Sequence, residues 1–464
     1  MKRAYSLLFS LFIFVSIFAD DAKAKYVFFF IGDGMGLNQV AMTEMYLAQK
    51  EGKIGAEKLC FTNFPYTGVA RTYSTDNSIT DSAAGGSALA TGEKTKNGTI
   101  SMDREHKISF ETIAEKAKKK GNSVGIMSSV SIDHATPASF FAHTPSRSMY
   151  YEIGAFIPES KFDFFGGSGF INPDKHKDKK KNLFHMFDKS GYKVARGVDE
   201  YEIVKNKTEK VILLQKADKP VDALPFAIDR NEDDLTLAQI TEKAIDFLSR
   251  KNKGFFMMIE GGKIDWSSHS NDAGTTIREV IDMDNAVKLA FDFYKQHPDS
   301  TLIVITADHE TGGLGLGVEG YTLALNNFDS QKVSQGVLST EINNLFKEND
   351  NLKWNRFKDF VEDKTGLWEV YKPTEAQTEE IKKSFERASD KRGEEKTKTE
   401  YSEDNALAAL IIKVINRNAK VGWTSNTHTA SYVPVYAIGA GAEKFIGVME
   451  NTDVPKKIAE AAGY

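Results

Sequence analysis

Uninterrupted apolar runs recur along the chain, and each ends in a turn rich in glycine or polar residues. The clearest runs cover residues 26–31, 255–259 and 301–306. Runs of this kind are typical of strands that are buried on both faces of a parallel sheet. Further strand patterns cover residues 68–74, 123–129, 211–214 and 433–438.

Amphipathic segments lie between these runs. Apolar residues at helical spacing cover residues 38–49, 110–120, 234–251 and 276–294. The alternation of strands and helices predicts an α/β fold, a three-layer αβα sandwich around a mostly parallel central sheet. Residues 159–233 are rich in Lys, Asp and Gly, and we interpret them as surface elaboration around one short strand.

The chain changes character between about residues 314 and 422. Helical patterns cover residues 354–360, 374–387 and 404–416. The segment 386–400 is highly charged, which indicates an exposed and mobile stretch. We therefore predict a mainly helical insertion within one catalytic domain that runs from residue 25 to residue 464.

Composition narrows the class of protein. Hydrophobic residues make up 41% and charged residues 27% of the chain, as in soluble globular proteins. The formal net charge of -5 is too small to indicate a nucleic-acid or acidic-membrane partner. Cys60 is the single cysteine and cannot form an intrachain disulfide, so stability must come from core packing and metals.

The N-terminus has the pattern of a secretory signal. Two basic residues precede an apolar run, residues 7–18, that is too short to span a bilayer. Cleavage after Ala19 or Ala24 would remove a signal peptide, predicted as residues 1–24, and make the protein periplasmic or secreted. The alternative is an uncleaved membrane anchor; no other run is long and apolar enough to cross a membrane.

A serine stands at the head of a run of small residues, residues 80–92. Asp81 and Ser82 suit the start of a helix, where side-chain oxygens cap free backbone N–H groups. A helix N-terminus also attracts anions, and small residues after Ser82 would let a substrate and metal ions approach. Taken alone, the segment is better explained as a capped helix used only for packing.

Polar side chains follow the predicted strands at the point where each strand ends. Asp33, Glu260 and Asp308 with His309 are the main examples, together with a pair of serines at residues 128–129. The carboxyl ends of strands are where ligands bind in open α/β sheets. Each residue also has an ordinary explanation, such as a turn, a helix cap or a loop histidine.

Candidate metal ligands are numerous at this edge. Asp265 and His269 are spaced i, i+4, so one helical turn would direct both at a single ion. Mixed carboxylate and imidazole ligands suit Zn²⁺, whereas oxygen ligands such as Asp33, Thr136 and Glu260 suit Mg²⁺. The full set of candidate ligands is Asp33, Thr136, Glu260, Asp265, His269, Asp308, His309 and His428.

These residues occur in motifs, and the set of motifs resembles the alkaline phosphatase family. The matching segments are Gly32-Asp33-Gly34-Met35-Gly36, Thr80-Asp81-Ser82-Ala83-Ala84, Ala135-Thr136-Pro137 with Arg147, residues 260–269, Asp308-His309-Glu310-Thr311-Gly312-Gly313 and Thr427-His428-Thr429. They follow the family's order and cover most of the chain. Each motif is weak alone, but the ordered set is highly specific.

The resemblance implies hydrolysis of small phosphate monoesters through a phosphoserine, with two zinc ions and one magnesium ion. Ser82 would be the nucleophile, and Arg147 would grip the phosphate. One zinc would be held by Asp265, His269 and His428, and the second by Asp33, Asp308 and His309. Asp33 would bridge to a magnesium also bound by Thr136 and Glu260. In the family, an insertion before the last zinc histidine can form a crown over the pocket or a contact in a homodimer.

Two positions depart from the family's prototype, which has Asp at the position of His134 and Lys at that of Trp266. His134 would either reach the third metal directly or only hydrogen-bond behind it. Trp266 removes a cation near the phosphate; it would either stack on a leaving group or pack in the pocket wall. Both changes are expected to alter rate and metal preference more than the type of reaction.

Two other functions fit part of the pattern. A phosphodiesterase or sulfatase relative would share the metal-binding residues, but such enzymes often use Thr or a modified Cys as nucleophile. A protein that only binds metal or phosphate would need neither Ser82 nor Arg147. The combination of Ser82, Thr136, Glu260 and Arg147 favours monoester hydrolysis.

Overall fold

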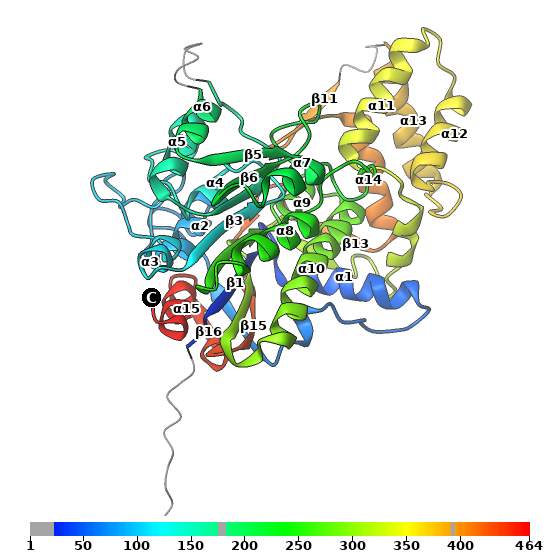
Figure 1. Cartoon of the computed structure of the whole chain (residues 1–464). Helices are drawn as coiled ribbons and strands as arrows, with labels where there is room; N and C mark the ends of the chain where they lie inside the picture. The colour runs from blue at the N-terminus through cyan, green and yellow to red at the C-terminus, as the bar shows by residue number, and fades with distance from the viewer. Residues whose placement is uncertain (1–22, 175–181, 391–394) are drawn as a thin grey trace, which may run out of the picture.

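A ten-stranded sheet forms the centre of the protein (Figure 1). The computed structural model describes residues 23–174, 182–390 and 395–464. In sheet order the strands are β16 (Gly447–Glu450), β2 (Tyr66–Arg71), β15 (Val433–Gly439), β8 (Thr301–Thr306), β1 (Tyr26–Ile31), β7 (Phe255–Glu260), β3 (Ser123–Ser128), β4 (Phe164–Gly167), β6 (Lys210–Leu214) and β5 (Tyr192–Arg196). All pairings are parallel except those of β15, which runs against both of its neighbours.

The register of the central strands brings their carboxyl ends to one level. Ile31 at the end of β1 lies beside Glu260 of β7 on one side and Thr306 of β8 on the other. Ser128 at the end of β3 is also paired with Glu260. The strands β3, β7 and β8 are buried at every residue, as continuous apolar runs require in a sheet covered on both faces.

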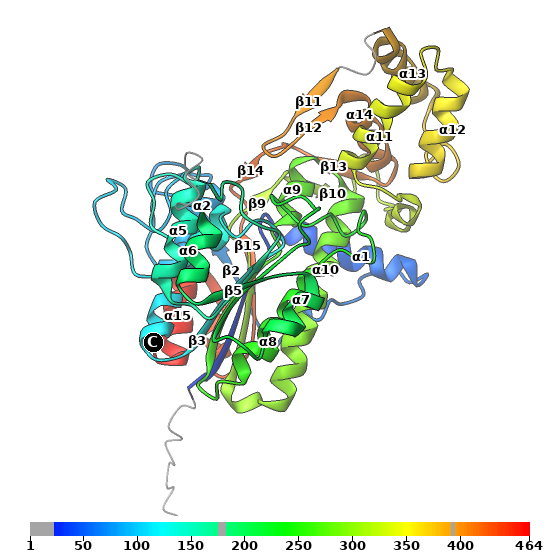
Figure 2. The same cartoon turned by 45° about the horizontal axis from the view of Figure 1, so that its top comes forward.

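Helices cover both faces of the sheet, so the predicted three-layer sandwich is confirmed (Figure 2). One layer holds α2 (Ser82–Thr91), α3 (Ile113–Lys119), α5 (Tyr150–Ser160), α6 (Leu183–Lys189) and α15 (Asp453–Ala462). The other holds α7 (Gly197–Val204), α8 (Leu237–Ser249) and α10 (Ala273–Gln296). Apolar residues of both layers and of the sheet belong to one large core cluster.

The interpretation of residues 159–233 as surface elaboration is wrong. This segment supplies three strands of the central sheet, β4, β6 and β5, and Phe164, Phe165 and Ile212 are fully buried. The strands are only four or five residues long. Their polar connections therefore dominated the composition of the whole segment and obscured the apolar strands.

A group of helices stands apart from the sheet (Figure 1), and its apolar residues form a second core cluster together with residues of α10 such as Ile277. It consists of α11 (Gln335–Glu348), which the sequence patterns did not predict, and α12 (Trp354–Thr365), α13 (Glu375–Asp390) and α14 (Ala406–Asn418), which they did. The chain enters and leaves this region through an antiparallel pair, β10 (Leu314–Leu316) and β13 (Val421–Trp423). The predicted insertion limits lie at this pair, although the division into domains stays a prediction.

A short hairpin extends from the helical group back over the sheet edge. Its strands are β11 (Lys396–Lys398) and β12 (Glu403–Asn405), which pair antiparallel. Figure 2 shows it directed toward β9 (Glu310–Thr311) and β14 (His428–Thr429), beside the end of the sheet. The segment predicted to be exposed and mobile thus includes one strand of this hairpin.

The predicted signal peptide falls almost wholly on residues 1–22, outside the described part of the chain. Its function and cleavage position stay predictions. Within the described residues, every helix is too short or too polar to span a bilayer.

Candidate active site

Three acidic residues come together because the strands that precede them end side by side. Asp33 lies two residues after β1, Glu260 ends β7, and Asp308 lies two residues after β8. All three are fully buried. Gly34 follows Asp33 directly and has φ +70°. A Cβ there would stand 2.9 Å from Asp265 Oδ1, so the turn after β1 requires glycine at this position.

Asp33, Asp308 and His309 form one group of potential metal ligands. His309 Nε2 lies 3.3 Å from Asp33 Oδ1 and 3.4 Å from Asp308 Oδ2. The hydroxyl of Thr136, on the short helix α4 (Ala135–Ala138), lies 3.3 Å from Asp33 Oδ2. The second predicted zinc set is therefore assembled in the structure, with Thr136 beside it.

Asp265, His269 and His428 form a second group. The first two lie one turn apart on α9 (Lys263–His269), and His269 Nε2 is 3.2 Å from Asp265 Oδ2. The pairing of β14 with β9 brings in His428, whose Nε2 is 3.2 Å from His269 Nε2. Residues 159 positions apart thus share one small volume, as the sequence predicts.

Asp33, His134 and Glu260 form a third group. His134 is buried, and its Nδ1 has no hydrogen-bond partner among the described residues. One oxygen of Glu260 accepts a hydrogen bond from Ser128, while Oε1 is also unpartnered within the described chain. His134 therefore offers a ligand atom within 4.8 Å of ligand atoms of Asp33 and Glu260.

Hydrogen bonds on the outer side of two histidines hold their rings in place. His269 Nδ1 lies 2.7 Å from the carbonyl of Asn426, and His428 Nδ1 lies 2.8 Å from the carbonyl of Thr80. Each Nδ1 therefore carries a proton and donates to a carbonyl, which directs Nε2 of each ring into the site. Both Nε2 atoms face Asp265.

The site concentrates negative charge where water is excluded. Burial is the first cause that raises the pKa of Asp33 well above its usual range, followed by repulsion from Asp308, Asp265 and Glu260. Burial likewise raises the pKa of Glu260, to about 7. Several buried carboxylates without a counter-charge are unfavourable, and bound cations would supply it. The ligand types and unpartnered oxygens thus fit divalent metals.

Ser82 begins α2 next to these groups. Asp81 caps the helix by accepting a hydrogen bond from the backbone N–H of Ala84 at 3.0 Å. Ser82 Oγ is buried and lies 3.2 Å from His309 Nε2. A Cβ on Gly85, one turn further, would stand 2.8 Å from the carbonyl oxygen of Asp308, so the small residues let the helix pack directly against the ligand loop.

Arg147 reaches the same place from the turn between α4 and α5. Its guanidinium donates from Nη1 to Asp81 Oδ2 at 3.1 Å and from Nη2 to the Tyr401 hydroxyl at 3.1 Å. Nη1 also lies 3.8 Å from a carboxylate oxygen of Glu400. A planar cation is therefore held against Asp81, the residue that precedes Ser82.

Comparison with known proteins agrees with this arrangement. The family model described as alkaline phosphatase matches residues 24–163 and 171–464. The chain belongs to the alkaline phosphatase family. Alkaline phosphatases are phosphomonoester hydrolases, so the chain is an enzyme of this class.

Individual relatives match over nearly the whole chain. Alkaline phosphatase 4 and alkaline phosphatase 3 of Bacillus subtilis are each 33% identical, covering 94% and 96% of this chain and 88% and 90% of their own. The cold-active alkaline phosphatase of a psychrophilic Shewanella has a TM-score of 0.78 at 29% identity, over 94% of this chain and 99% of its own.

Two residues of this alkaline phosphatase site were missed by the sequence patterns, Glu400 and Tyr401. Both lie at the tip of the β11–β12 hairpin. The Tyr401 ring stacks on Trp266 with centroids 4.6 Å apart and planes at 10°. Burial raises the pKa of Tyr401 well above its usual range, so the hydroxyl is neutral and accepts a hydrogen bond from Arg147. Only the charge of the segment was visible in the sequence, and charge favours an exposed surface.

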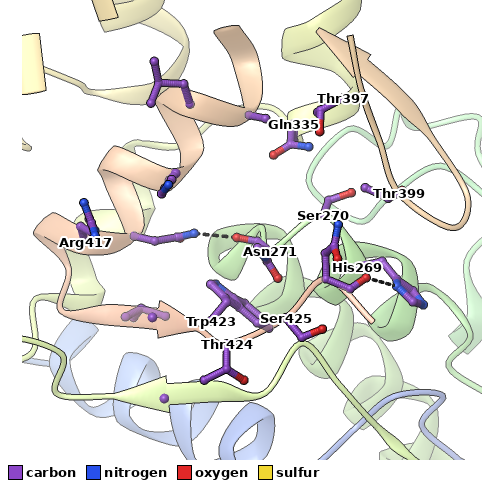
Figure 3. Close-up of a pocket in the computed structure, with 18 of the residues that line it drawn as sticks. His269, Ser270, Asn271, Gln335, Thr397, Thr399, Arg417, Trp423, Thr424 and Ser425 are labelled. Atoms are coloured by element: carbon purple, nitrogen blue, oxygen red, sulfur yellow. Dashed lines mark hydrogen bonds between the residues drawn. The ribbon is translucent and has the colours of Figure 1, made fainter. Parts of the chain in front are cut away.

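A cavity of about 750 Å³ lies beside the catalytic groups, beneath the hairpin. Figure 3 shows Thr397 and Thr399 at one edge, Trp423 at the opposite edge, and Ser270 and Asn271 between them. His269 lines the cavity and, through its ring, also belongs to the ligand group. The tip of the hairpin therefore contacts other protein residues through Tyr401, whereas Thr397 and Thr399 border the cavity.

Proposed function

We propose that the enzyme hydrolyses phosphate monoesters by a two-zinc, one-magnesium mechanism with a phosphoserine intermediate at Ser82. The observation that carries the proposal is the position of Ser82 Oγ, 3.2 Å from one potential ligand and preceded by the residue that binds Arg147. The zinc ions would be held by Asp265, His269 and His428 and by Asp33, Asp308 and His309. The magnesium would be held by Asp33, Thr136 and Glu260, with His134 beside it.

The chain's own residues account for binding and for the covalent step. Arg147 and the N-terminus of α2 favour a dianionic phosphoryl group. As the bond from Ser82 Oγ to phosphorus forms, the bond from phosphorus to the alcohol oxygen breaks. The proton that the serine loses is matched by one that the alcohol gains. Water then attacks phosphorus, the serine ester bond breaks, and Ser82 regains a proton as phosphate leaves.

Serine is a weak nucleophile at its ordinary pKa and needs activation. Bound divalent cations supply charge that lowers the pKa of a nearby hydroxyl and stabilises negative charge on the leaving oxygen. His309, which lies 3.2 Å from Ser82 Oγ, also faces Asp33 and Asp308, so its position supports activation by a bound cation over the action of a free base.

The test uses an aryl phosphate assay at alkaline pH. Ser82→Ala is expected to lower kcat roughly a thousandfold or more. Ser78→Ala, which alters an exposed serine four residues earlier, is the matched control and should keep full activity. Mass spectrometry of acid-quenched enzyme should find phosphate on the peptide with Ser82. Intact hydrolysis in Ser82→Ala would overturn the mechanism, and faster cleavage of a bis-aryl phosphate would favour a phosphodiesterase.

The identity of the third metal has a separate test. A mutant of the TAB5 alkaline phosphatase, 26% identical over 96% of this chain with a TM-score of 0.67, is described with Mg bound in the M3 site. We propose a comparable site at Asp33, Thr136 and Glu260, with His134 beside it. Elemental analysis of the purified protein should give two zinc and one magnesium per chain, and Glu260→Gln should lose the magnesium while keeping both zinc ions.

Export and assembly are also proposals. A signal peptide of residues 1–24 would send the enzyme to the periplasm or the medium, where phosphate esters from outside the cell are available. Fractionation of cells with N-terminal sequencing of the mature chain tests this. A homodimer would be detected by light scattering of the purified enzyme.

A further inference from the structure

The tip of the β11–β12 hairpin reaches the candidate site described above. Residues 399–402 connect β11 to β12, and a hydrogen bond from the Thr399 N–H to the Ser402 carbonyl at 2.9 Å closes the turn. The Thr399 and Ser402 hydroxyls, 2.9 Å apart, tighten the same turn. Glu400 and Tyr401 therefore project from a defined turn.

Tyr401 contacts several parts of the site at once. Its ring stacks on Trp266, and its centroid lies 5.5 Å from that of His134 and 5.3 Å from that of His269. These ring contacts hold the side chain in one orientation. The hydroxyl at the end of that ring accepts the hydrogen bond from Arg147 Nη2.

Arg147 is thus held by two acceptors on different nitrogens. Asp81 Oδ2 accepts a hydrogen bond from Nη1, and the Tyr401 hydroxyl accepts one from Nη2, both at 3.1 Å. A guanidinium held at one nitrogen can rotate about that contact, whereas two contacts fix its plane. A fixed plane is what bidentate binding of two phosphoryl oxygens requires.

We infer that Tyr401 is a positioning residue for phosphate binding, which acts by fixing the plane of the Arg147 guanidinium. The inference rests on the proposed function, because it assumes that Arg147 binds the phosphoryl group. By this inference the helical region takes part in phosphate binding. The sheet side supplies the nucleophile and the metal ligands, and the hairpin supplies Tyr401, which orients Arg147.

The test is Tyr401→Phe, which removes the hydroxyl and keeps the ring on Trp266. The inhibition constant of inorganic phosphate and KM for an aryl phosphate are expected to rise about three- to tenfold, with kcat changed less than twofold. Tyr432→Phe is the matched control, because it removes another tyrosine hydroxyl bonded to an arginine, Arg71 at 3.2 Å, on an exposed part of the protein. This control should leave both constants unchanged.

A double-mutant cycle separates positioning from general loss of structure. In an Arg147→Ala background, Tyr401→Phe should add no further weakening of phosphate inhibition, since the group it orients is gone. Equal effects of Tyr401→Phe in the two backgrounds would overturn the inference, as would unchanged constants in the single variant. Melting temperatures of all variants verify that each is folded.

The cycle also separates this inference from the proposal beneath it. If Arg147→Ala leaves phosphate inhibition and KM unchanged, the assignment of Arg147 fails, and the proposed function fails at that point. If Arg147→Ala weakens both and Tyr401→Phe weakens neither, only the role of Tyr401 is overturned.

Discussion

The edge of the central sheet and the β11–β12 hairpin both face Arg147, but they are built differently. The sheet edge draws its groups from strands in fixed register, and Asp33, Glu260 and Asp308 are fully buried. The hairpin is a single local segment beside an open cavity, and the Glu400 side chain at its tip is 40% exposed. The proposed metal ligands are thus fixed by the sheet, whereas the proposed support of Arg147 comes from a hairpin that stands beside open space.

Metal removal should show the largest difference between the two regions. A strong chelator is expected to lower kcat/KM by about a thousandfold or more, since the cations stabilise the charges that develop at phosphorus. Stability should also fall, by about 3–4 kcal/mol if the metals were present at several hundred times their Kd. Activity is measured before and after adding back zinc and magnesium.

Hydrogen exchange in the same samples compares the regions directly. Chelation should reduce protection in the loops around Asp33, Glu260 and Asp308, because their carboxylates lose their counter-ions. Helices α11 to α13 contribute no proposed ligand and should keep their protection. Loss of protection in these helices before the sheet-edge loops would contradict the comparison.

Packing should matter more at the sheet edge than in the helical region. Gly85→Ala would place a Cβ 2.8 Å from the Asp308 carbonyl oxygen and shift either α2 or the ligand loop. We expect kcat/KM to fall roughly ten- to a hundredfold. The matched variant is Gly336→Ala in α11, where the nearest atom would be 3.8 Å away. It should keep full activity and gain up to about 1 kcal/mol in unfolding free energy.

A smaller effect is expected from the charge at the hairpin tip. Glu400 lies 3.8 Å from Arg147 Nη1 and so competes with an anion for the guanidinium. Glu400→Gln is expected to lower the inhibition constant of phosphate about two- to fivefold, because a partly exposed ion pair is worth little. Lys398→Gln nearby on β11 serves as the control. Weaker inhibition in Glu400→Gln would show that the carboxylate supports the grip instead.

The smallest effect concerns pH and stability on the sheet side, away from the ligands. Burial disfavours the charged form of His143, but hydrogen bonds with Glu115 and the Ser101 carbonyl outweigh it and raise its pKa. The folded state therefore binds this proton more tightly, and the stability gained is present below about pH 6.5 and lost as pH rises through the folded-state pKa.

His143→Gln should accordingly cost about 1 kcal/mol of unfolding free energy near pH 6 and less near pH 9. Urea denaturation of both proteins at the two pH values measures this. The difference between them cancels the effects of other titrating groups. An equal cost at both pH values would show that His143 acts only by packing.

The sequence predicted which side chains gather at the sheet edge because their positions depend on nearby residues in the chain. Most of the candidate ligands follow an apolar strand directly or are spaced i, i+4 from another, and parallel pairing brings the strand ends together. Thr136 and His428 were named from the resemblance to a known family. The sequence did not reveal the contact of Tyr401 with Arg147, because it joins residues 254 positions apart and depends on how the helical region is oriented.

The strands β4 and β5 were not predicted from the sequence, and the reason is different. They contain four and five residues, and periodicity over so few positions is indistinguishable from chance. Helices α6 and α7 pack on β5, and α8 packs on β4, so these strands are covered by helices that their own pattern does not reveal. Short strands within polar surroundings are where composition misleads most.

The two oxygens of Asp81 have separate partners, and this has a mechanical consequence. One oxygen holds the first turn of the helix that begins with Ser82, and the other holds Arg147 and the N–H of Gly98. The proposed nucleophile and the proposed anion-binding group are consequently linked through the two oxygens of one carboxylate. A displacement of Asp81 would therefore move the start of this helix and the guanidinium together.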